Sequence, residues 1–305
     1  MISVIVPVYN AINTLDRCLN SLTRQGIDNL KIILVDDGSN DGSEKKCDDW
    51  AEKHGGVTVI HKQNGGLSDA RNEGLKAVDT DYVTFVDADD FLQDNSYKEL
   101  SEVIKQHPEY DIVEFPVFVN FGSKNEQVLK FKKQLFKSFE DYWLKGRGYK
   151  HSYAWNKIYK TKLFDSVKFP EGVLFEDLHT MPELMKRAKC LATVNTGVYY
   201  YCFNQQGITA NADGKALEMM LKAYLNVIED NPHFINDNDF YMEVVNRQID
   251  VYRTSGKKMG IPHKRIHNIR HFDKKSYRWK ARIINVCGVS NLCRIVKLQR
   301  KCMIF

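Results

Sequence analysis

Three carboxylates follow a predicted strand at residues 82–91. The segment YVTFVDADDF is rich in β-branched and aromatic residues, which favours a strand, and it runs directly into Asp87, Asp89 and Asp90. Because an ionised carboxylate is costly to bury without a partner, these side chains must end at solvent, at a cation or at both. Alternate residues of an extended chain share a face, so Asp87 and Asp89 can together hold one hard divalent cation. An acidic turn is the commoner explanation of an isolated Asp-x-Asp, so the rest of the sequence has to decide.

A second acidic pair lies in the segment FPEGVLFEDLHTMPELMKRA, which begins at Phe169. Pro182 fits the first turn of a helix, which predicts that Glu176 and Asp177 lie just before or at its N-terminus. A helix N-terminus stabilises an anion, so it keeps Asp177 ionised and also weakens it as a base. Instead of acting as a base, Asp177 could cap the N-terminus of this helix.

Strand and helix patterns alternate over the first 120 residues. Runs of apolar residues predict strands, and apolar residues at helical spacing between these runs predict amphipathic helices. The predicted strands cover residues 2–9, 31–35, 57–61, 82–86 and 111–119. Near-continuous apolar strands separated by helices are typical of an α/β fold, with a parallel sheet covered by helices on both faces.

Polar residues collect where the first four predicted strands end. They are Tyr9 and Asn10, Asp36 and Asp37, Lys62 and Asn64, and Asp87 and Asp89. The carboxyl ends of parallel strands meet at one edge of a sheet, and ligands of open α/β sheets bind at that edge. The sequence therefore predicts that these scattered groups form one site.

Six motifs in this order and spacing resemble those of the family 2 glycosyltransferases with a GT-A fold. They are VIVPVYN, ILVDDGSNDGS, NGGLSDARNEGL, TFVDADD, WNKIY and FEDLH, and the resemblance covers residues 1–210. It implies the GT-A nucleotide-diphospho-sugar transferase fold and an inverting enzyme. Such an enzyme transfers a hexose or N-acetylhexosamine from a nucleotide diphosphate donor, commonly a UDP-sugar, with Mg²⁺ or Mn²⁺. Similar family members extend lipid-linked glycans in bacterial capsule and other polysaccharide synthesis.

The resemblance assigns the donor side of the site to the first four strand ends. Tyr9 offers an aromatic face for uracil, and Asp37 could accept the uracil N–H. Gly65 and Gly66 let the backbone approach a ligand, and Arg71, about one turn into a helix, could contact the nucleotide or its diphosphate. A salt bridge from Arg71 to Asp37 or Asp89 is the alternative. The remaining expected nucleotide-sugar contacts are Pro7, Asn64, Asp87 and Ala88.

The same resemblance assigns the metal and the catalytic groups. We expect Asp89 to be the direct metal ligand, with Asp87 touching ribose or metal and Asp90 in support. In the family, the Asp of the Glu-Asp pair is the catalytic base, and Asp177 matches it. Glu176 would then orient the base or bind the acceptor.

On the acceptor side, the resemblance points to Trp155, Asn156 and Lys157, where a tryptophan face suits a sugar ring. Core packing of Trp155 is the alternative. His179 could contact the donor phosphate or cap its helix. The segment YYYCFNQQGIT, residues 199–209, departs from the family pattern, so phosphate contacts from it are in doubt.

The expected domain organisation is a catalytic domain over residues 1–210 and a helical, basic extension over residues 211–305. The catalytic domain divides into a nucleotide-binding half, 1–120, and an acceptor-side half, 121–210, near the polar segment GSKNEQ. The net charge is +5, yet residues 274–305 carry nine Lys or Arg and no acid, so the remainder carries −4.

Apolar residues interleave with these nine basic residues, which favours an anionic membrane surface as partner and not nucleic acid. Docking of the tail onto the catalytic domain, or a homodimer contact, is the alternative. His263, His267 and His271 recur every four residues on a predicted helix. They are interpreted as part of a solvated basic face, because no acid or cysteine completes a metal site.

Several function classes are disfavoured by what the sequence lacks. No run of 18 apolar residues and no signal-peptide pattern occurs, so we expect a cytoplasmic protein, peripheral at the inner face of the membrane at most. Seven cysteines without a C-x-x-C pair favour reduced thiols. Neither G-x-G-x-x-G nor a P-loop is present. A nucleotidyltransferase on a similar fold and an inactive nucleotide or glycan binder are the alternative functions.

Overall fold

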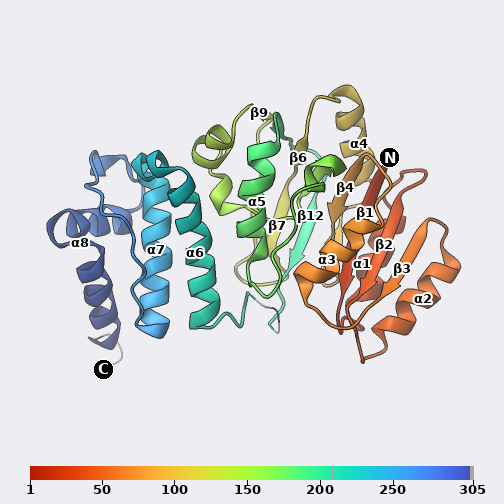
Figure 1. The fold of residues 1–305 in the computed structure, drawn as a ribbon, viewed down its shortest axis with the longest axis horizontal. Coiled ribbons are helices and arrows are strands. Elements are labelled where there is room, and N and C mark those ends of the chain that lie inside the picture. Colours follow the sequence, from red (N-terminus) through yellow and green to blue (C-terminus); the bar gives the residue numbers. More distant parts are fainter. Residues whose placement is uncertain (206, 208, 303–305) are drawn as a thin grey trace. The chain divides into compact units, whose positions relative to one another are not determined.

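The computed structural model describes residues 1–205, 207 and 209–302, the side chains of 299–302 excepted. The chain forms two compact units. Unit 1 comprises residues 1–142 and 152–205, and unit 2 comprises residues 143–151 and the described part of 206–305 (Figure 1).

An eight-stranded sheet forms the centre of unit 1, with strand order β3-β2-β1-β4-β10-β6-β11-β9. Its strands are β1 (Ile2–Val8), β2 (Lys31–Asp36), β3 (Val57–His61), β4 (Tyr82–Phe85), β6 (Ile112–Glu114), β9 (Gln134–Phe136), β10 (Lys157–Lys160) and β11 (Leu191–Thr193). The first four run parallel and lie side by side in Figure 1. Their pairing aligns Val8 with Asp36 and Asp36 with His61, so the predicted shared edge at the strand ends is confirmed.

Helices cover both faces of this sheet, as the periodicity predicts. Alternate residues of β1, from Ile2 to Val8, share one buried cluster with residues of α1 (Leu15–Thr23), α2 (Ser43–Lys53) and α4 (Ser96–Gln106). Helix α3 (Leu67–Lys76) packs on β1 and β2, where Ile5 and Val35 approach its Gly74. Since Ile5 lies between the residues of the first cluster, α3 covers the opposite face. The α/β fold class is therefore confirmed.

The predicted single strand over residues 111–119 is wrong, because two strands in two sheets replace it. Pro116 separates β6 from β7 (Val117–Phe121), since proline cannot donate to a sheet ladder. Strand β7 belongs to a four-stranded sheet of order β5-β12-β7-β8, with β5 (Phe91–Leu92), β8 (Gln127–Leu129) and β12 (Tyr199–Cys202). The segment GSKNEQ joins β7 to β8 in an antiparallel hairpin. The expected division at residue 120 therefore falls inside one sheet.

Helix α5 (Glu176–Arg187) completes the regular helices of unit 1. The short helical turns along the chain are η1 (Asp141–Lys145), η2 (Gly148–Lys150), η3 (Thr161–Phe164), η4 (Pro232–Asn236) and η5 (Ile269–His271). Cys18 and Cys47 lie in the core, as their apolar helix positions predict.

Unit 2 is helical and contains α6 (Gly214–Asp230), α7 (Asn238–Ser255) and α8 (Lys275–Cys302). Helix α8 is interrupted at Gly288, whose φ of 78° is not helical. Ile284 and Leu292 of α8 are buried in one apolar cluster with Tyr241 and Ile249 of α7. The apolar face of the tail thus packs within its own unit.

Two expectations for the tail change in the structure. His263 and His267 lie in irregular backbone and His271 in the short turn η5, so the predicted helix through the three histidines is wrong. Arg300 and Lys301, two of the nine basic residues, have side chains outside the described part.

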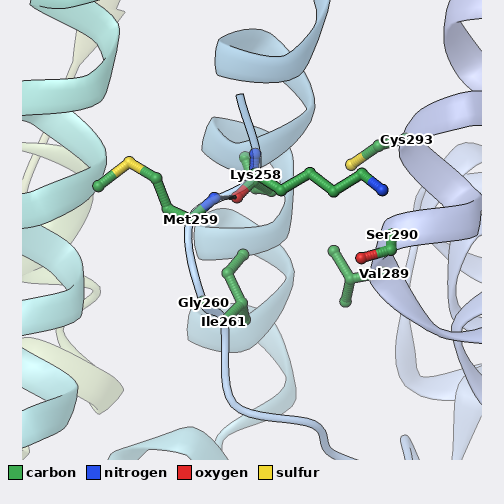
Figure 2. Close-up of a pocket in the computed structure, with 8 residues that line it drawn as sticks. Lys258, Met259, Gly260, Ile261, Val289, Ser290 and Cys293 are labelled. Atoms are coloured by element: carbon green, nitrogen blue, oxygen red, sulfur yellow. Dashed lines mark hydrogen bonds between the residues drawn. The ribbon is translucent and has the colours of Figure 1, made fainter. Parts of the chain in front are cut away.

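A small pocket of about 160 Å³ lies in unit 2 between α7, the segment after it and α8. Figure 2 shows Lys258 extending toward Ser290 and Cys293 of α8. None of the residues that line it belongs to the sequence-predicted site. Across the described residues, no helix combines the length and the apolar character needed to cross a membrane.

Candidate active site

Asp37, directly after β2, holds the loop that follows β3. Its carboxylate accepts hydrogen bonds from the backbone N–H groups of Gly65 (2.9 Å) and Gly66 (2.8 Å) and from Lys62 Nζ (2.7 Å). Asn64 Nδ2 donates to the Asp37 carbonyl oxygen at 3.0 Å. These four contacts fix the glycine loop against the end of β2, so Asp37 organises the loop in addition to any ligand that it accepts.

The side chains of Asp69 and Lys62 occupy the space that a Cβ at Gly65 would fill. A Cβ at Gly65 would lie 2.0 Å from Asp69 Oδ2 and 2.9 Å from Lys62 Nζ. Gly66, with φ of 90°, has open space around the same position. Of the two glycines, Gly66 therefore leaves room beside the backbone.

Tyr9 lies at the carboxyl end of β1 with 54% of its surface exposed. Its neighbour Asn10 is fixed on the backbone, donating its N–H to Ser39 Oγ at 3.0 Å. An exposed aromatic ring at this edge is available for stacking. Pro7, two residues before Tyr9, is buried within β1. Ala88 is buried as well, so neither of these two side chains is open to a ligand.

Arg71 joins the ends of distant segments. It is the fifth residue of α3, as predicted, and only 1% of its side chain is exposed. Its Nη2 donates to Asp87 Oδ1 at 2.9 Å, and its Nη1 donates to Asp177 Oδ1 at 3.0 Å and to Glu176 Oε1. The alternative to ligand contact was an ion pair with Asp37 or Asp89, and the observed partners are different carboxylates. The reason is that α3 carries the guanidinium under the end of β4 and the start of α5.

Aromatic rings lie close to the guanidinium group of Arg71. Its guanidinium carbon lies 5.3 Å from the ring centroid of Phe169 and 5.8 Å from that of Phe85. Within the described residues its Nε has no hydrogen-bond partner. Three carboxylates therefore share one desolvated cation, and a net negative charge remains at this point.

The three carboxylates after β4 have different environments. Asp90 is buried and accepts hydrogen bonds from Tyr199 Oη (2.8 Å) and from the Cys202 N–H (2.7 Å), so it ties β5 to β12. Asp89 is partly exposed, and its Oδ2 accepts from Asn204 Nδ2 at 2.8 Å. Burial, and then the charge of Asp87, raises the pKa of Asp89.

This donor set fits a divalent cation. Asp87 and Asp89 supply hard carboxylate oxygens, and a cation would relieve the repulsion by which the charge of Asp87 raises the pKa of Asp89. Among the described residues, no three His, Cys, Asp or Glu side chains converge as a metal cage. A cation held by Asp89 would therefore draw further ligands from a substrate or from water.

Helix α5 begins at Glu176, so both acidic residues lie in its first turn, as predicted. The reason given for that prediction was wrong, because Pro182 lies inside the helix and not in its first turn. A proline there leaves the carbonyl of Leu178 without its helical partner. Phe175, before the helix, has a φ of 59° and is the N-cap position, so Asp177 is not the cap.

Asp177 is held on both carboxylate oxygens. Oδ1 accepts from Arg71, and Oδ2 accepts from the backbone N–H of Ala154 at 3.1 Å. Burial raises the pKa of Asp177 to about 7; the Arg71 charge opposes this rise, while Glu176 and Asp87 add to it. Burial and the neighbouring carboxylates thus offset the weakening that a helix N-terminus and an arginine impose on a base.

The segment expected on the acceptor side is buried. Trp155 stacks on Tyr199 (ring centroids 4.4 Å apart) and on Tyr153 (4.5 Å), and Asn156 and Lys157 have no exposed surface. These three side chains therefore present almost no surface to an acceptor, and their assignment to the acceptor side stays a prediction. The segment leads into β10, an interior strand of the sheet, so core packing, the alternative for Trp155, is what we observe.

His179 lies within the first turns of α5 and does not occupy the N-cap position, so the capping alternative is not observed. Two contacts of the site were missed by sequence reasoning. Asn204, which contacts Asp89, follows β12, and the rule of polar residues at strand ends could have found it. The Ala154 N–H, which contacts Asp177, is a backbone group and leaves no signal in the sequence.

Comparison with known proteins shows consistent similarity. The model of the family described as "Glycosyl transferase family 2" matches residues 3–168. The uncharacterized glycosyltransferase EpsJ of Bacillus subtilis is 32% identical over 220 residues, which are 68% of this chain and 63% of EpsJ. The minor teichoic acid biosynthesis protein GgaB of the same organism is 30% identical over 221 residues, 70% of this chain and 24% of GgaB. The chain thus spans less than two thirds of either relative.

A solved structure supports the fold. S. aureus TarS, residues 1–349, in complex with UDP-GlcNAc, superposes with a TM-score of 0.67 at 23% identity, covering 84% of this chain and 74% of that one. At this identity the likeness concerns the fold. Together with the family match over more than half of the sequence, it leads to one assignment: the chain belongs to glycosyl transferase family 2.

Proposed function

We propose that this protein transfers a hexose or N-acetylhexosamine from a UDP-sugar to a hydroxyl of a glycan acceptor, with inversion at the anomeric carbon. The proposed product is a cell-surface polysaccharide, and the acceptor is a lipid-linked glycan. Family membership supports the reaction class, and the name of GgaB, a minor teichoic acid biosynthesis protein, supports the kind of pathway.

The observation that carries the proposal is the Arg71 cluster. One guanidinium contacts Asp87, from the acidic run after β4, and Asp177, at the start of α5. These residues are the expected donor-side group and the expected base, and they are 90 positions apart in sequence. In sugar transfer, the group that binds the leaving UDP and the base that activates the acceptor must lie on opposite sides of one sugar. The shared contact of Asp87 and Asp177 with Arg71 supports such an arrangement.

On the donor side, we propose that uracil stacks on Tyr9 and that the loop held by Asp37 lies against the nucleotide. Asp89, oriented by Asn204, would hold Mn²⁺ or Mg²⁺ together with diphosphate oxygens. When bound, the cation neutralises the charge that grows on the departing UDP. The TarS complex with UDP-GlcNAc, on the same fold, supports a nucleotide sugar as donor.

On the acceptor side, we propose that Asp177 takes the proton of the attacking hydroxyl. The acceptor oxygen forms its bond to the anomeric carbon as the bond to UDP breaks, and UDP leaves with the electron pair. The Ala154 N–H and Arg71 orient the two carboxylate oxygens. A pKa near neutrality allows Asp177 to be both deprotonated at physiological pH and a competent proton acceptor.

UDP release tests the proposal. We expect the purified full chain with Mn²⁺ to release UDP from at least one member of a UDP-sugar panel, slowly without acceptor and faster with a lipid-linked glycan. Asp177→Asn and Asp89→Ala should each lower turnover at least about 100-fold, as loss of a general base does. Asp81→Asn, the same chemical change at an exposed side chain, should leave turnover within twofold.

Two results would contradict the proposal. One is the absence of UDP release with every donor, metal and acceptor mixture from a protein that is folded by circular dichroism. The other is unchanged turnover in Asp177→Asn. Transfer with retention of the anomeric configuration, measured by NMR of the product, would contradict the inverting assignment alone.

A further inference from the structure

One peptide group of unit 1 is held on both sides by charged residues. It is the peptide that joins Tyr153 to Ala154. Its carbonyl oxygen accepts a hydrogen bond from Lys157 Nζ at 2.8 Å, and its N–H donates to Asp177 Oδ2 at 3.1 Å. Because a peptide group is planar and rigid, fixing its oxygen also fixes the direction of its N–H.

Lys157 is itself held by a buried ion pair. Its Nζ lies 2.9 Å from Glu114 Oε1, and neither side chain has any exposed surface. Tyr142 Oη donates to Glu114 Oε2 at 2.9 Å, and Lys157 Nζ also donates to Asn156 Oδ1 at 2.8 Å. Each of these contacts lies within unit 1. Removing such a charge pair from water costs free energy, so stability alone does not explain why the pair is buried here.

We propose that the Glu114–Lys157 pair positions the catalytic base through the peptide between Tyr153 and Ala154. The ammonium group fixes the carbonyl oxygen and polarises the peptide, which strengthens the hydrogen bond that the N–H donates to Asp177. Glu114 fixes the ammonium group, and β6 and β10 carry the two charges. Lys157 is thus a positioning residue that acts on Asp177 without contacting the substrate.

The geometry of Ala154 adds to this arrangement. The carbonyl oxygen of Ala154 accepts a hydrogen bond from Tyr159 Oη at 3.0 Å, two residues along β10 from Lys157. Two successive carbonyl groups, of Tyr153 and Ala154, are therefore tied to side chains of one strand. The N–H between them has little freedom to turn away from Asp177.

The inference rests on the proposed role of Asp177, so its test includes a readout that needs no turnover. In the full chain labelled with ¹⁵N-alanine, the amide proton of Ala154 reports its hydrogen bond to Asp177. We expect this resonance to move upfield in Asp177→Asn, where the acceptor loses its charge. The double variant Glu114→Gln/Lys157→Met should move it in the same direction and speed its exchange with solvent.

The double variant is preferred because Lys157→Met alone leaves Glu114 buried without its cation, and such a protein can fail to fold. Removing both charges avoids that cost. If the chain is active, the double variant should lower kcat about 10- to 100-fold while leaving the KM for the donor within twofold, because a misdirected base slows the chemical step and not donor binding.

A matched control lies on the same strand. Lys160 of β10 forms a 2.9 Å ion pair with Asp111 and does not contact the Tyr153–Ala154 peptide. Asp111→Asn/Lys160→Met should leave the Ala154 resonance and kcat at the values of the unmodified chain.

An unchanged Ala154 resonance in Glu114→Gln/Lys157→Met overturns the inference, whether or not the chain transfers sugar. A shifted resonance with unchanged kcat in an active chain also overturns the positioning role. A chain that releases no UDP but shows the shift would contradict the proposed function and retain the structural relay, so the two failures can be told apart.

Discussion

One arginine and three carboxylates define the chemistry of this site at the scale of single residues. Arg71 is almost fully buried and contacts Asp87, Glu176 and Asp177. A guanidinium is always charged and presents its donors in a fixed fork, so it can hold carboxylates from different segments at once. Burial, with a smaller contribution from the charges of Glu176 and Asp87 and against the opposing charge of Arg71, raises the pKa of Asp177 to about 7.

This environment predicts the pH dependence of turnover. Asp177 acts as a base only when deprotonated, so kcat should be constant above its pKa and fall as the pH drops through about 7. Glu176→Gln removes a carboxylate that raises this pKa, so the midpoint should move to lower pH. Pre-steady-state UDP release between pH 5 and 9 checks both statements. Glu102→Gln, an exposed change in α4, should not move the midpoint, and a rate that rises toward acid pH would refute the assignment.

Stability should also depend on Arg71. Replacing it by methionine leaves three carboxylates around a site without a cation, and breaking such a buried pair costs about 3–5 kcal/mol of unfolding free energy. Urea denaturation of the full chain measures this loss. Arg24→Met removes an exposed pair with Asp94 and should cost at most about 1 kcal/mol. Equal losses in the two variants would contradict the buried cluster.

At the scale of elements, the loops after β2 and β3 contact each other through hydrogen bonds and close packing. Asp37 accepts hydrogen bonds from the N–H groups of the glycine loop, and Gly38 lies so close to this loop that an added Cβ would meet the backbone of Asn64. Each loop is therefore stabilised by contacts with the other. This coupling explains why polar and glycine residues 25 or more positions apart are needed at one edge of the sheet.

Gly38 gives a test of this coupling. Its φ is 73°, and an added Cβ would lie 2.9 Å from the backbone nitrogen of Asn64. Gly38→Ala is therefore expected to cost about 1–3 kcal/mol of unfolding free energy and to weaken UDP binding in calorimetry. Gly55→Ala, where an added Cβ meets no atom within 4 Å, should change stability by less than about 0.5 kcal/mol. A tolerated alanine at position 38 would argue against close contact of the loops.

At the scale of the whole molecule, the chain combines an α/β unit that carries the candidate site with a helical unit that contains the basic, acid-free segment of residues 274–305. The apolar face of α8 that could have entered a bilayer is largely used in packing, because Ile284 and Leu292 are buried with α7. Val286 and Leu298 remain 87% and 62% exposed as single apolar side chains, and three basic residues are exposed on the same helix, Lys275, Arg282 and Arg294. What α8 offers to a surface is therefore mainly charge.

Membrane association of the full chain should accordingly be electrostatic. We expect it to sediment with vesicles that contain phosphatidylserine at low salt and to be released by about 0.5 M NaCl, since screening weakens such contacts. Vesicles of phosphatidylcholine alone are the control and should not bind it. Binding that persists in high salt would instead indicate an apolar anchor, and absence of binding at low salt would contradict the membrane surface as a partner.

Much of unit 1 could be predicted from local patterns. The strands β1 to β4 are apolar runs, the helices between them have a 3.6-residue period, and strand ends carry polar residues. Local pattern failed where one residue changes the outcome, as at Pro116, which splits a predicted strand, and at Pro182, which α5 accommodates in its interior. Context around a proline decides whether an element ends there, and that context is tertiary.

The sequence alone determined the fold class, the shared edge of the parallel strands and the family, because these follow from periodicity, from the topology of parallel sheets and from motifs. Only the tertiary structure decided which carboxylates Arg71 contacts, that Lys157 is buried beside Glu114, and that the apolar face of α8 packs on α7. Periodicity shows that a face will be buried but does not say against what. Partners far apart in sequence are chosen by how the elements pack, and the pKa of Asp177 depends on those partners.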